Sequence, residues 1–213
     1  YVDHPSFGVA IVGRVLEAEG FSVAVLARPD PDDAEAFRLA GRPRLAWLAA
    51  SGVLDSMVSS YTANRRPRSE DAYAPGGNPA LCLRADGSIG VGVKGRANAR
   101  PDRAVIAYAA KCREAFKGVP VVLGGLEASL RRLSHYDHRS DTVRRSILLD
   151  SKADLLVHGM AERQLVALAR RLAAGEDARA IRGLRGTAWW TSKESELPAG
   201  SIRLPPFAAV TGA

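Results

Sequence analysis

The chain has 213 residues, 46% of them hydrophobic, which is enough for one α/β domain with a sizeable core, alone or with an extension. No apolar run approaches the length of about 20 residues that a membrane span needs. No signal-peptide pattern is present either, so we expect a cytoplasmic protein without a membrane partner. The net charge of +7 comes mostly from arginine and is spread along the chain, which favours a solvated surface over a nucleic-acid face.

Helices and strands are predicted to alternate along the first part of the chain. Apolar residues at helical spacing indicate a helix over 7–19, with Ser6 as N-cap and Gly20 as its stop. The next elements are predicted as a strand, a short helix, a strand and a helix, at 21–27, 33–40, 45–49 and 53–63.

The pattern dissolves between residues 64 and 100, which are rich in Gly, Pro, Arg, Asn and Asp. One small hairpin is predicted there, with strands at 81–84 and 89–93 joined by a turn that contains Asp-Gly. A long loop inside a compact domain is usually either functional or disordered, and the residues leave both interpretations open.

Regular structure returns with a helix that begins at Pro101 and ends at Gly118, followed by a buried strand at 119–123. The remaining elements are predicted as helical segments within 128–133 and 140–149, a strand at 154–158, a helix at 161–173 and a strand at 187–192. The segment 198–213 shows no periodicity and is expected to be a linker.

The alternation of strands and helices predicts a doubly wound parallel sheet with helices on both faces, of the flavodoxin-like or cobalamin-binding-like type. The first helix has no strand before it, so we expect that strand upstream of Tyr1. The domain is predicted to cover residues 1–193, with 64–100 as a long loop or insertion and 194–213 as a linker.

The carboxyl ends of the strands are the predicted cofactor-binding edge, because ligands of open α/β sheets bind there. Two strands end in glycines, and the loop before the first helix is rich in polar residues. The candidate residues at this edge are Asp3, His4, Ser6, Gly8, Gly124, Gly125, Glu127, Ser129 and Gly159. For Glu127 and for Glu162, capping of a helix N-terminus is an alternative and favoured role.

Other candidate chemistry is weaker. His135 and His138, with Asp137 and Asp141 beside them, have the ligand types of a metal site, although a polar surface cluster is the favoured interpretation. No nucleophile elbow or phosphate-binding loop is present, and we predict no catalytic residue. Two cysteines suit a reducing compartment and are too few for the three or four thiolates of an iron–sulfur cluster.

Five sequence blocks, in this order, resemble one known family. They are Tyr-Val-Asp-His-Pro-Ser-Phe-Gly at 1–8, Ser-Glu-Asp-Ala-Tyr-Ala-Pro-Gly-Gly at 69–77, Arg-Pro-Asp-Arg-Ala-Val-Ile at 100–106, Val-Leu-Gly-Gly-Leu-Glu-Ala-Ser-Leu-Arg-Arg at 122–132 and Val-Arg-Arg-Ser-Ile-Leu at 143–148. They are similar to the N-terminal region of the YgiQ-type radical S-adenosylmethionine (radical SAM) proteins, over nearly the whole chain. Residues 78–95 look like an insertion relative to that family.

The resemblance implies a cobalamin-binding-like accessory domain that precedes a radical-SAM barrel of the same polypeptide. It also implies a [4Fe-4S] cluster that splits S-adenosylmethionine, bound by a three-cysteine loop outside this chain. Cobalamin-binding modules of the base-off type use Asp-x-His-x-x-Gly, whereas here His4 directly follows Asp3, which argues against His4 as a cobalt ligand.

Two alternatives to the accessory domain stay open. One is an Arg-rich module that binds RNA. It is supported by the +7 charge and by Arg65, Arg66 and Arg68. The other is a flavodoxin-like domain that binds a phosphorylated cofactor, which flavin colour in the purified protein would identify.

Overall fold

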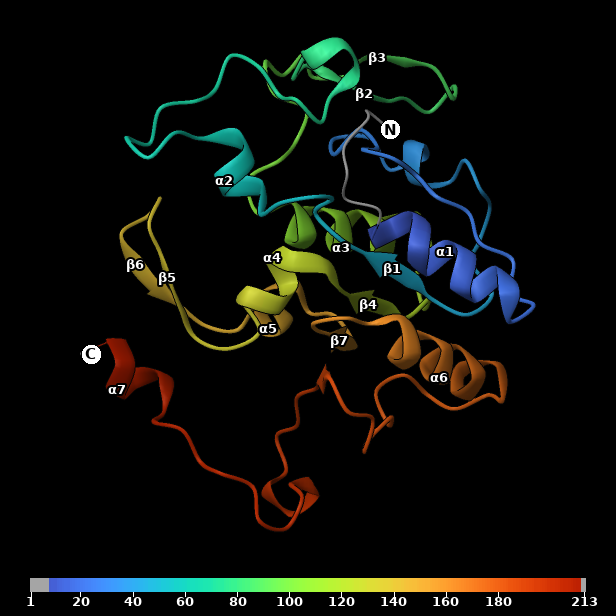
Figure 1. The fold of residues 1–213 in the computed structure, drawn as a ribbon, viewed down its shortest axis with the longest axis vertical. Coiled ribbons are helices and arrows are strands. Elements are labelled where there is room, and N and C mark those ends of the chain that lie inside the picture. The colour runs from blue at the N-terminus through green and yellow to red at the C-terminus, as the bar shows by residue number, and fades with distance from the viewer. Residues whose placement is uncertain (1–7, 212–213) are drawn as a thin grey trace.

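The computed structural model describes residues 8–211, and Figure 1 shows a central sheet with helices on both of its faces. The helices are α1 (Gly8–Ala18), α2 (Ser56–Ser60), α3 (Ala104–Ala115), α4 (Gly125–Leu130), α5 (Ile147–Ser151), α6 (Glu162–Ala173) and α7 (Phe207–Thr211). The strands are β1 (Trp47–Ala49), β2 (Leu81–Leu83), β3 (Ile89–Val91), β4 (Val121–Leu123), β5 (His135–Asp137), β6 (Thr142–Arg144), β7 (Leu155–Val157) and β8 (Thr187–Ala188). Single turns of 3₁₀ helix lie at Glu35–Phe37, Pro75–Gly77 and Glu194–Glu196.

The central sheet has the strand order β1-β4-β7-β8. The first three strands are parallel, with Trp47 opposite Val121 and Val122 opposite Leu155, and β8 closes one side in the antiparallel direction. All residues of β4 and β7 are buried, as expected for parallel strands that are covered on both faces. The architecture is therefore the predicted doubly wound α/β fold of the flavodoxin-like type.

Alternate residues of the central strands supply two separate cores. Val121 and Leu123 of β4, with Leu156 of β7, pack against α3 and α5. Val122 and Leu155 face the other way, where α6 and α1 pack together. Burial of each such side chain contributes about 1.5–3 kcal/mol, so the two-sided sheet is the main source of stability.

Several predicted elements are confirmed with shorter bounds. The helices at 7–19 and 161–173 are α1 and α6, and the strands at 119–123 and 154–158 are β4 and β7. Two other predicted elements are much shorter in the structure. The helix predicted at 33–40 is a single 3₁₀ turn, and the strand predicted at 187–192 has two residues. The tail contains a short exposed helix, α7, that the absence of periodicity did not predict.

Two predictions of secondary structure are wrong. Residues 21–27 form no strand, because within the described chain no neighbouring strand pairs with them. Their apolar residues alternate as in a strand, but no partner strand supplies the hydrogen bonds of a ladder. The helix within 140–149 is replaced by β6 and then by α5, which starts only where Ser146 caps it. Thr142 and Val143 are β-branched, and β6 pairs with β5 in an antiparallel hairpin that the sequence analysis missed.

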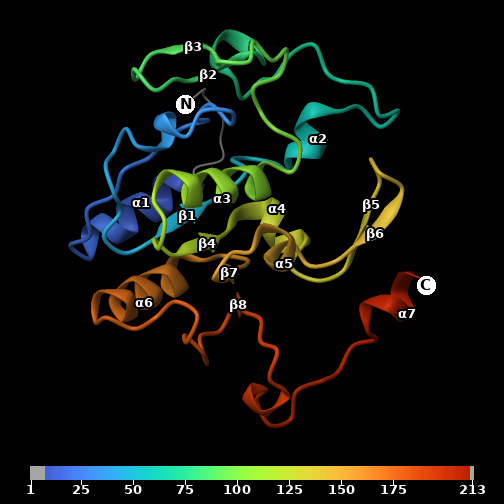
Figure 2. The same ribbon diagram turned by 180° about the vertical axis from the view of Figure 1, so that it is seen from behind.

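The segment 64–100 is folded, and it includes the predicted hairpin as β2 and β3. Figures 1 and 2 show it on the side of the molecule opposite β8 and α7. A buried aspartate, Asp71, fastens it: Arg28 donates to Asp71 at 2.6 Å, and Arg100 donates to the same oxygen at 3.2 Å. Burial alone would raise the pKa of Asp71, but the two guanidinium groups outweigh this and lower it.

No helix among residues 8–211 is long and apolar enough to cross a membrane.

Candidate functional site

The carboxyl ends of β1, β4 and β7 lie side by side because these strands are parallel and adjacent. The backbone N–H of Gly124 donates to the carbonyl of Ala49 at 2.9 Å and so extends the ladder to the turn. Gly125 has a φ of +78°, and a Cβ there would lie 3.2 Å from the Cβ of Ala50. Gly125 therefore permits a close approach of the turn after β4 to the end of β1 that a larger residue would disturb.

Ser129 joins the ends of β4 and β7. Its hydroxyl donates to the carbonyl of Gly125 at 2.7 Å and accepts from the N–H of Gly159 at 3.2 Å. Gly159, with a φ of +75°, turns the chain away from β7 toward α6. The structure thus brings together four of the predicted edge residues, and they hold one another through backbone and hydroxyl contacts.

The other predicted residues are placed differently. Gly8 begins α1, and nothing lies within 4 Å of a Cβ built on it. Asp3, His4 and Ser6, together with the predicted N-cap role of Ser6 and the expected first strand, lie outside the described residues.

Glu127 points into the protein. It is fully buried; its Oε2 accepts from the backbone N–H of Ser56 at 2.8 Å, and its Oε1 accepts from that of Val105 at 3.0 Å. These groups belong to the first turns of α2 and α3, so one carboxylate caps two helices other than its own. Burial raises the pKa of Glu127, although the hydrogen bonds from Ser56 and Val105 oppose the rise.

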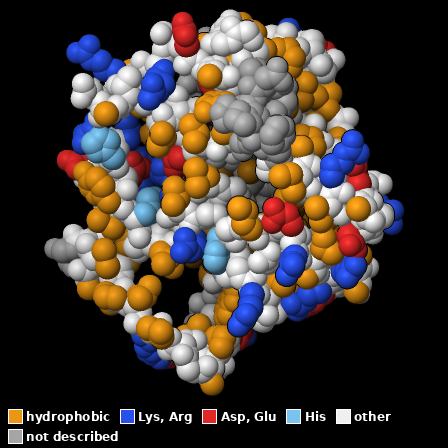
Figure 3. Space-filling view, in the orientation of Figure 1, with side chains coloured by type: hydrophobic (Ala, Val, Ile, Leu, Met, Phe, Trp, Pro, Cys, Tyr) orange, Lys and Arg blue, Asp and Glu red, His pale blue; other side chains and the backbone are white. Residues whose placement is uncertain are grey.

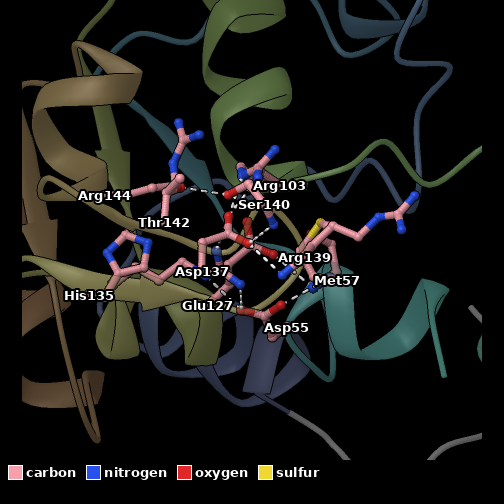
Figure 4. Close-up of polar contacts among 12 residues, drawn as sticks. Asp55, Met57, Arg103, Glu127, His135, Asp137, Arg139, Ser140, Thr142 and Arg144 are labelled. Atoms are coloured by element: carbon pink, nitrogen blue, oxygen red, sulfur yellow. Dashed lines mark hydrogen bonds and ion pairs between the residues drawn. The ribbon is translucent and has the colours of Figure 1, made fainter. Parts of the chain in front are cut away.

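An arginine–aspartate network lies next to Glu127, as Figure 4 shows, and the sequence analysis did not find it. Arg131 donates to Asp55 at 2.7 Å, and Arg103 donates to the buried Asp137 at 2.8 Å. Asp55 also caps α2, because its Oδ1 accepts from the N–H of Met57 at 2.9 Å. Two of the five sequence blocks contain Arg103 and Arg131, but nothing in the sequence indicates their distant partners.

Near the strand ends, two further basic groups are close together. Burial lowers the pKa of His158, and the positive charge of Arg132 lowers it further. Arg132 belongs to the residues that follow α4, and His158 follows β7. His158 directly precedes Gly159, and Arg132 donates to the carbonyl of Ser129, so both basic residues lie beside the glycine turns.

Within residues 8–211, no three His, Cys, Asp or Glu side chains form a group able to hold a metal ion. His135 lies in β5, and the Nε2 of His138 is 3.2 Å from the carbonyl of Ala63, so the two histidines serve a hairpin and its contact with a loop. His138 and Asp141 are exposed, as expected for a polar surface cluster, whereas Asp137 is buried and pairs with Arg103.

The two cysteines do not fit an iron–sulfur cluster. Cys82 lies in β2 and Cys112 in α3, and both thiols are buried and free. Burial raises the pKa of Cys82 to about 11 and that of Cys112 to about 12, so both stay protonated at neutral pH. A cluster takes thiolates as ligands. These residues therefore supply no cluster chemistry.

Fold and edge together define an open α/β domain of the flavodoxin-like class. The chain belongs to the radical SAM N-terminal family, and the match to this family covers residues 1–213. It is 49% identical over 99% of its length to a UPF0313 protein of Geobacter sulfurreducens. UPF0313 proteins of Shewanella oneidensis and Methanocella arvoryzae are 53% and 48% identical over 88% and 99% of the chain. No solved structure matches it.

The matched region covers 32%, 22% and 32% of these three relatives, in the order given. The chain thus spans between 22% and 32% of the length of these curated relatives.

Proposed function

We propose that this chain is the accessory N-terminal domain of a radical SAM enzyme. In this proposal a [4Fe-4S] cluster cleaves S-adenosylmethionine elsewhere in a longer polypeptide, and this chain supplies none of the cluster ligands. The observation that carries the proposal is the family match over all residues, in a chain that corresponds to a third or less of its relatives. The two cysteine thiols described above are protonated and lie in separate elements, which supports the proposal that the cluster ligands lie outside this chain.

The carboxyl edge of the sheet is the proposed contact with the rest of that polypeptide. Large apolar side chains are exposed there: Leu126, Leu130 and Leu133 in and after α4, at 44%, 61% and 51%, and Met160 after β7, at 85%. Figure 3 shows hydrophobic side chains on this face, over the region of α4 and α5. Several large apolar side chains exposed on neighbouring elements favour an interaction site.

The glycine turns make this edge suitable for a close contact. Gly124, Gly125 and Gly159 leave the backbone uncovered by side chains of their own, and Ser129 holds the turns in place. We assign Glu127 the role of fixing the edge from inside rather than touching a ligand, because both of its oxygens already accept hydrogen bonds. The described residues do not argue for a cobalamin ligand, and the proposal includes no cobalamin.

The test of the enzyme class uses the complete polypeptide that contains this chain, purified without oxygen and reconstituted with iron and sulfide. We expect about four irons per chain and release of 5′-deoxyadenosine from S-adenosylmethionine. Absence of both would overturn the proposal, and flavin colour in that preparation would instead support the flavodoxin-like alternative.

The test of the contact edge uses Leu130→Arg and Met160→Arg in the same polypeptide. We expect the iron content to be unchanged, while limited proteolysis releases this domain faster and cofactor cleavage falls. Val93→Arg is the matched control, because Val93 is 66% exposed but lies beyond β3, away from the strand ends. If the edge variants behave like the Val93 variant, the edge is not the contact.

A further inference from the structure

A second surface of the molecule combines arginines with an exposed aromatic ring. It consists of Arg65, Arg66 and Arg68 in the loop after α2, and of Tyr136 and Arg139 in the β5–β6 hairpin. We call these five residues the arginine platform. In Figure 3, basic side chains gather where Figure 1 places this loop and the end of the hairpin.

The loop and the hairpin hold each other. The guanidinium group of Arg139 lies over the ring of Tyr61, 4.3 Å from its centroid, and donates to the carbonyl of Arg65 at 3.0 Å. Within the loop, the N–H of Thr62 donates to the carbonyl of Arg66 at 2.9 Å. The backbone that carries the arginines is therefore fixed before any ligand arrives, which lowers the entropic cost of binding.

The arginines of the platform differ from the arginines of the buried network in their partners. None of its four guanidinium groups forms an ion pair within residues 8–211, whereas Arg103 and Arg131 each face a buried aspartate. Arg66, Arg68 and Arg139 are exposed. The Nε of Arg68 donates to the carbonyl of Tyr61 at 3.2 Å, and Arg139 donates to that of Arg65. Each guanidinium group has five N–H donors, so donors remain on both for a phosphate oxygen.

Tyr136 adds an apolar surface next to this charge. It is 57% exposed, and its hydroxyl donates to Asp141. Tyr136 and Arg139 belong to the same β5–β6 hairpin, and Arg139 contacts the arginine-bearing loop at the carbonyl of Arg65. Arginines beside an exposed aromatic ring are typical of surfaces that bind single-stranded nucleic acid, because the bases stack while the arginines contact phosphates.

We propose that the arginine platform binds single-stranded nucleic acid such as RNA, with phosphates on the arginines and one base stacked on Tyr136. This inference goes beyond the accessory-domain function and does not depend on it. The platform lies on the loop after α2 and on the hairpin, whereas the proposed contact edge lies at α4 and after β7, so the two surfaces can be tested separately.

The experiment measures fluorescence anisotropy of a short labelled oligouridylate with the complete polypeptide over a range of salt concentrations. With four phosphate contacts and a slope of about 0.7 per contact, affinity should fall about 50-fold between about 50 and about 200 mM salt. In the double variant Arg66→Ala/Arg68→Ala, two contacts remain, and the same salt step should lower affinity only about sevenfold.

The matched control is Arg163→Ala/Arg185→Ala, which removes two exposed arginines that also form no ion pair with any residue of 8–211 but lie in α6 and before β8. It should leave the salt dependence unchanged. Tyr136→Phe and Tyr136→Ala both lose the hydroxyl, so their difference isolates the ring; we expect the Phe variant to bind at least about fivefold more tightly.

Three results would overturn the proposal: no binding at low salt, equal salt slopes in the platform and control variants, or binding of an acidic peptide in place of the oligouridylate. The last result would assign the platform to an acidic protein segment. Circular dichroism of each variant shows whether it is folded, so that a loss of binding is attributed to the missing side chain.

Discussion

Replacement of Glu127 by glutamine tests whether one carboxylate caps two helices. The side chain keeps its size, but the amide has only one acceptor oxygen, so the N–H of either Ser56 or Val105 then faces an NH₂ group. A buried donor without an acceptor costs about 1–3 kcal/mol. We therefore expect Glu127→Gln to lower the free energy of unfolding by about 2 kcal/mol near neutral pH.

The assay is urea unfolding followed by far-ultraviolet circular dichroism, with a thermal melt beside it. For a chain of this size, about 2 kcal/mol corresponds to a fall in Tm of about 4–8 °C. Glu162→Gln is the control, because Glu162 lies in the first turn of α6, where its favourable interaction with the helix dipole is worth at most about 1 kcal/mol. Equal stability of the Glu127 variant and the wild-type chain would refute the double-cap reasoning.

The pH dependence supplies a second readout with a definite sign. Burial raises the pKa of Glu127 above its ordinary value of 4.5, so the folded state favours the protonated acid. The stability that this group contributes is greatest below the ordinary pKa and is lost as the pH rises through the folded-state pKa. Glutamine does not titrate. The difference in the free energy of unfolding between the wild-type chain and the variant should therefore become smaller as the pH rises.

Three further predictions concern other features of the molecule. Gly125→Ala should cost about 1–2 kcal/mol in urea unfolding, because alanine is strained at positive φ and its Cβ would press on Ala50. Asp71→Asn should cost about 3–5 kcal/mol, since it leaves the buried guanidinium group of Arg100 and the partly buried one of Arg28 without this counter-charge; an unchanged urea midpoint would contradict this. Cys82 and Cys112 should react with a thiol reagent at mildly alkaline pH only after unfolding.

The sequence predicts best the elements whose burial is two-sided or whose ends carry caps. β4 and β7 are continuous apolar runs that end in glycine, and α6 has a clear apolar face, so the order of the central units could be predicted. Residues 21–27 show the limit of such reasoning. Their alternating pattern is that of a strand, but a strand exists only where a neighbour accepts its backbone hydrogen bonds.

The candidate site was predictable in part for a related reason. The glycine turns and Ser129 follow directly from strand ends, which are visible in the sequence. The partners of Asp55 and Asp71 are not, because Arg131 lies 76 positions from Asp55 and Arg28 lies 43 positions from Asp71. The direction of the Glu127 side chain also depends on α2 and α3, which only the folded chain brings to it.

The register of the sheet has a consequence for the order of folding. β4 and β7 are separated by residues 124–154, whereas β1 and β4 are separated by the longer stretch 50–120, which includes the whole segment 64–100. Contacts between distant parts of a chain form late, because closing a long loop costs entropy before any contact repays it. We therefore expect amides of β4, α4, β7 and α6 to gain protection from hydrogen exchange first, and those of β1 and the 64–100 segment to follow.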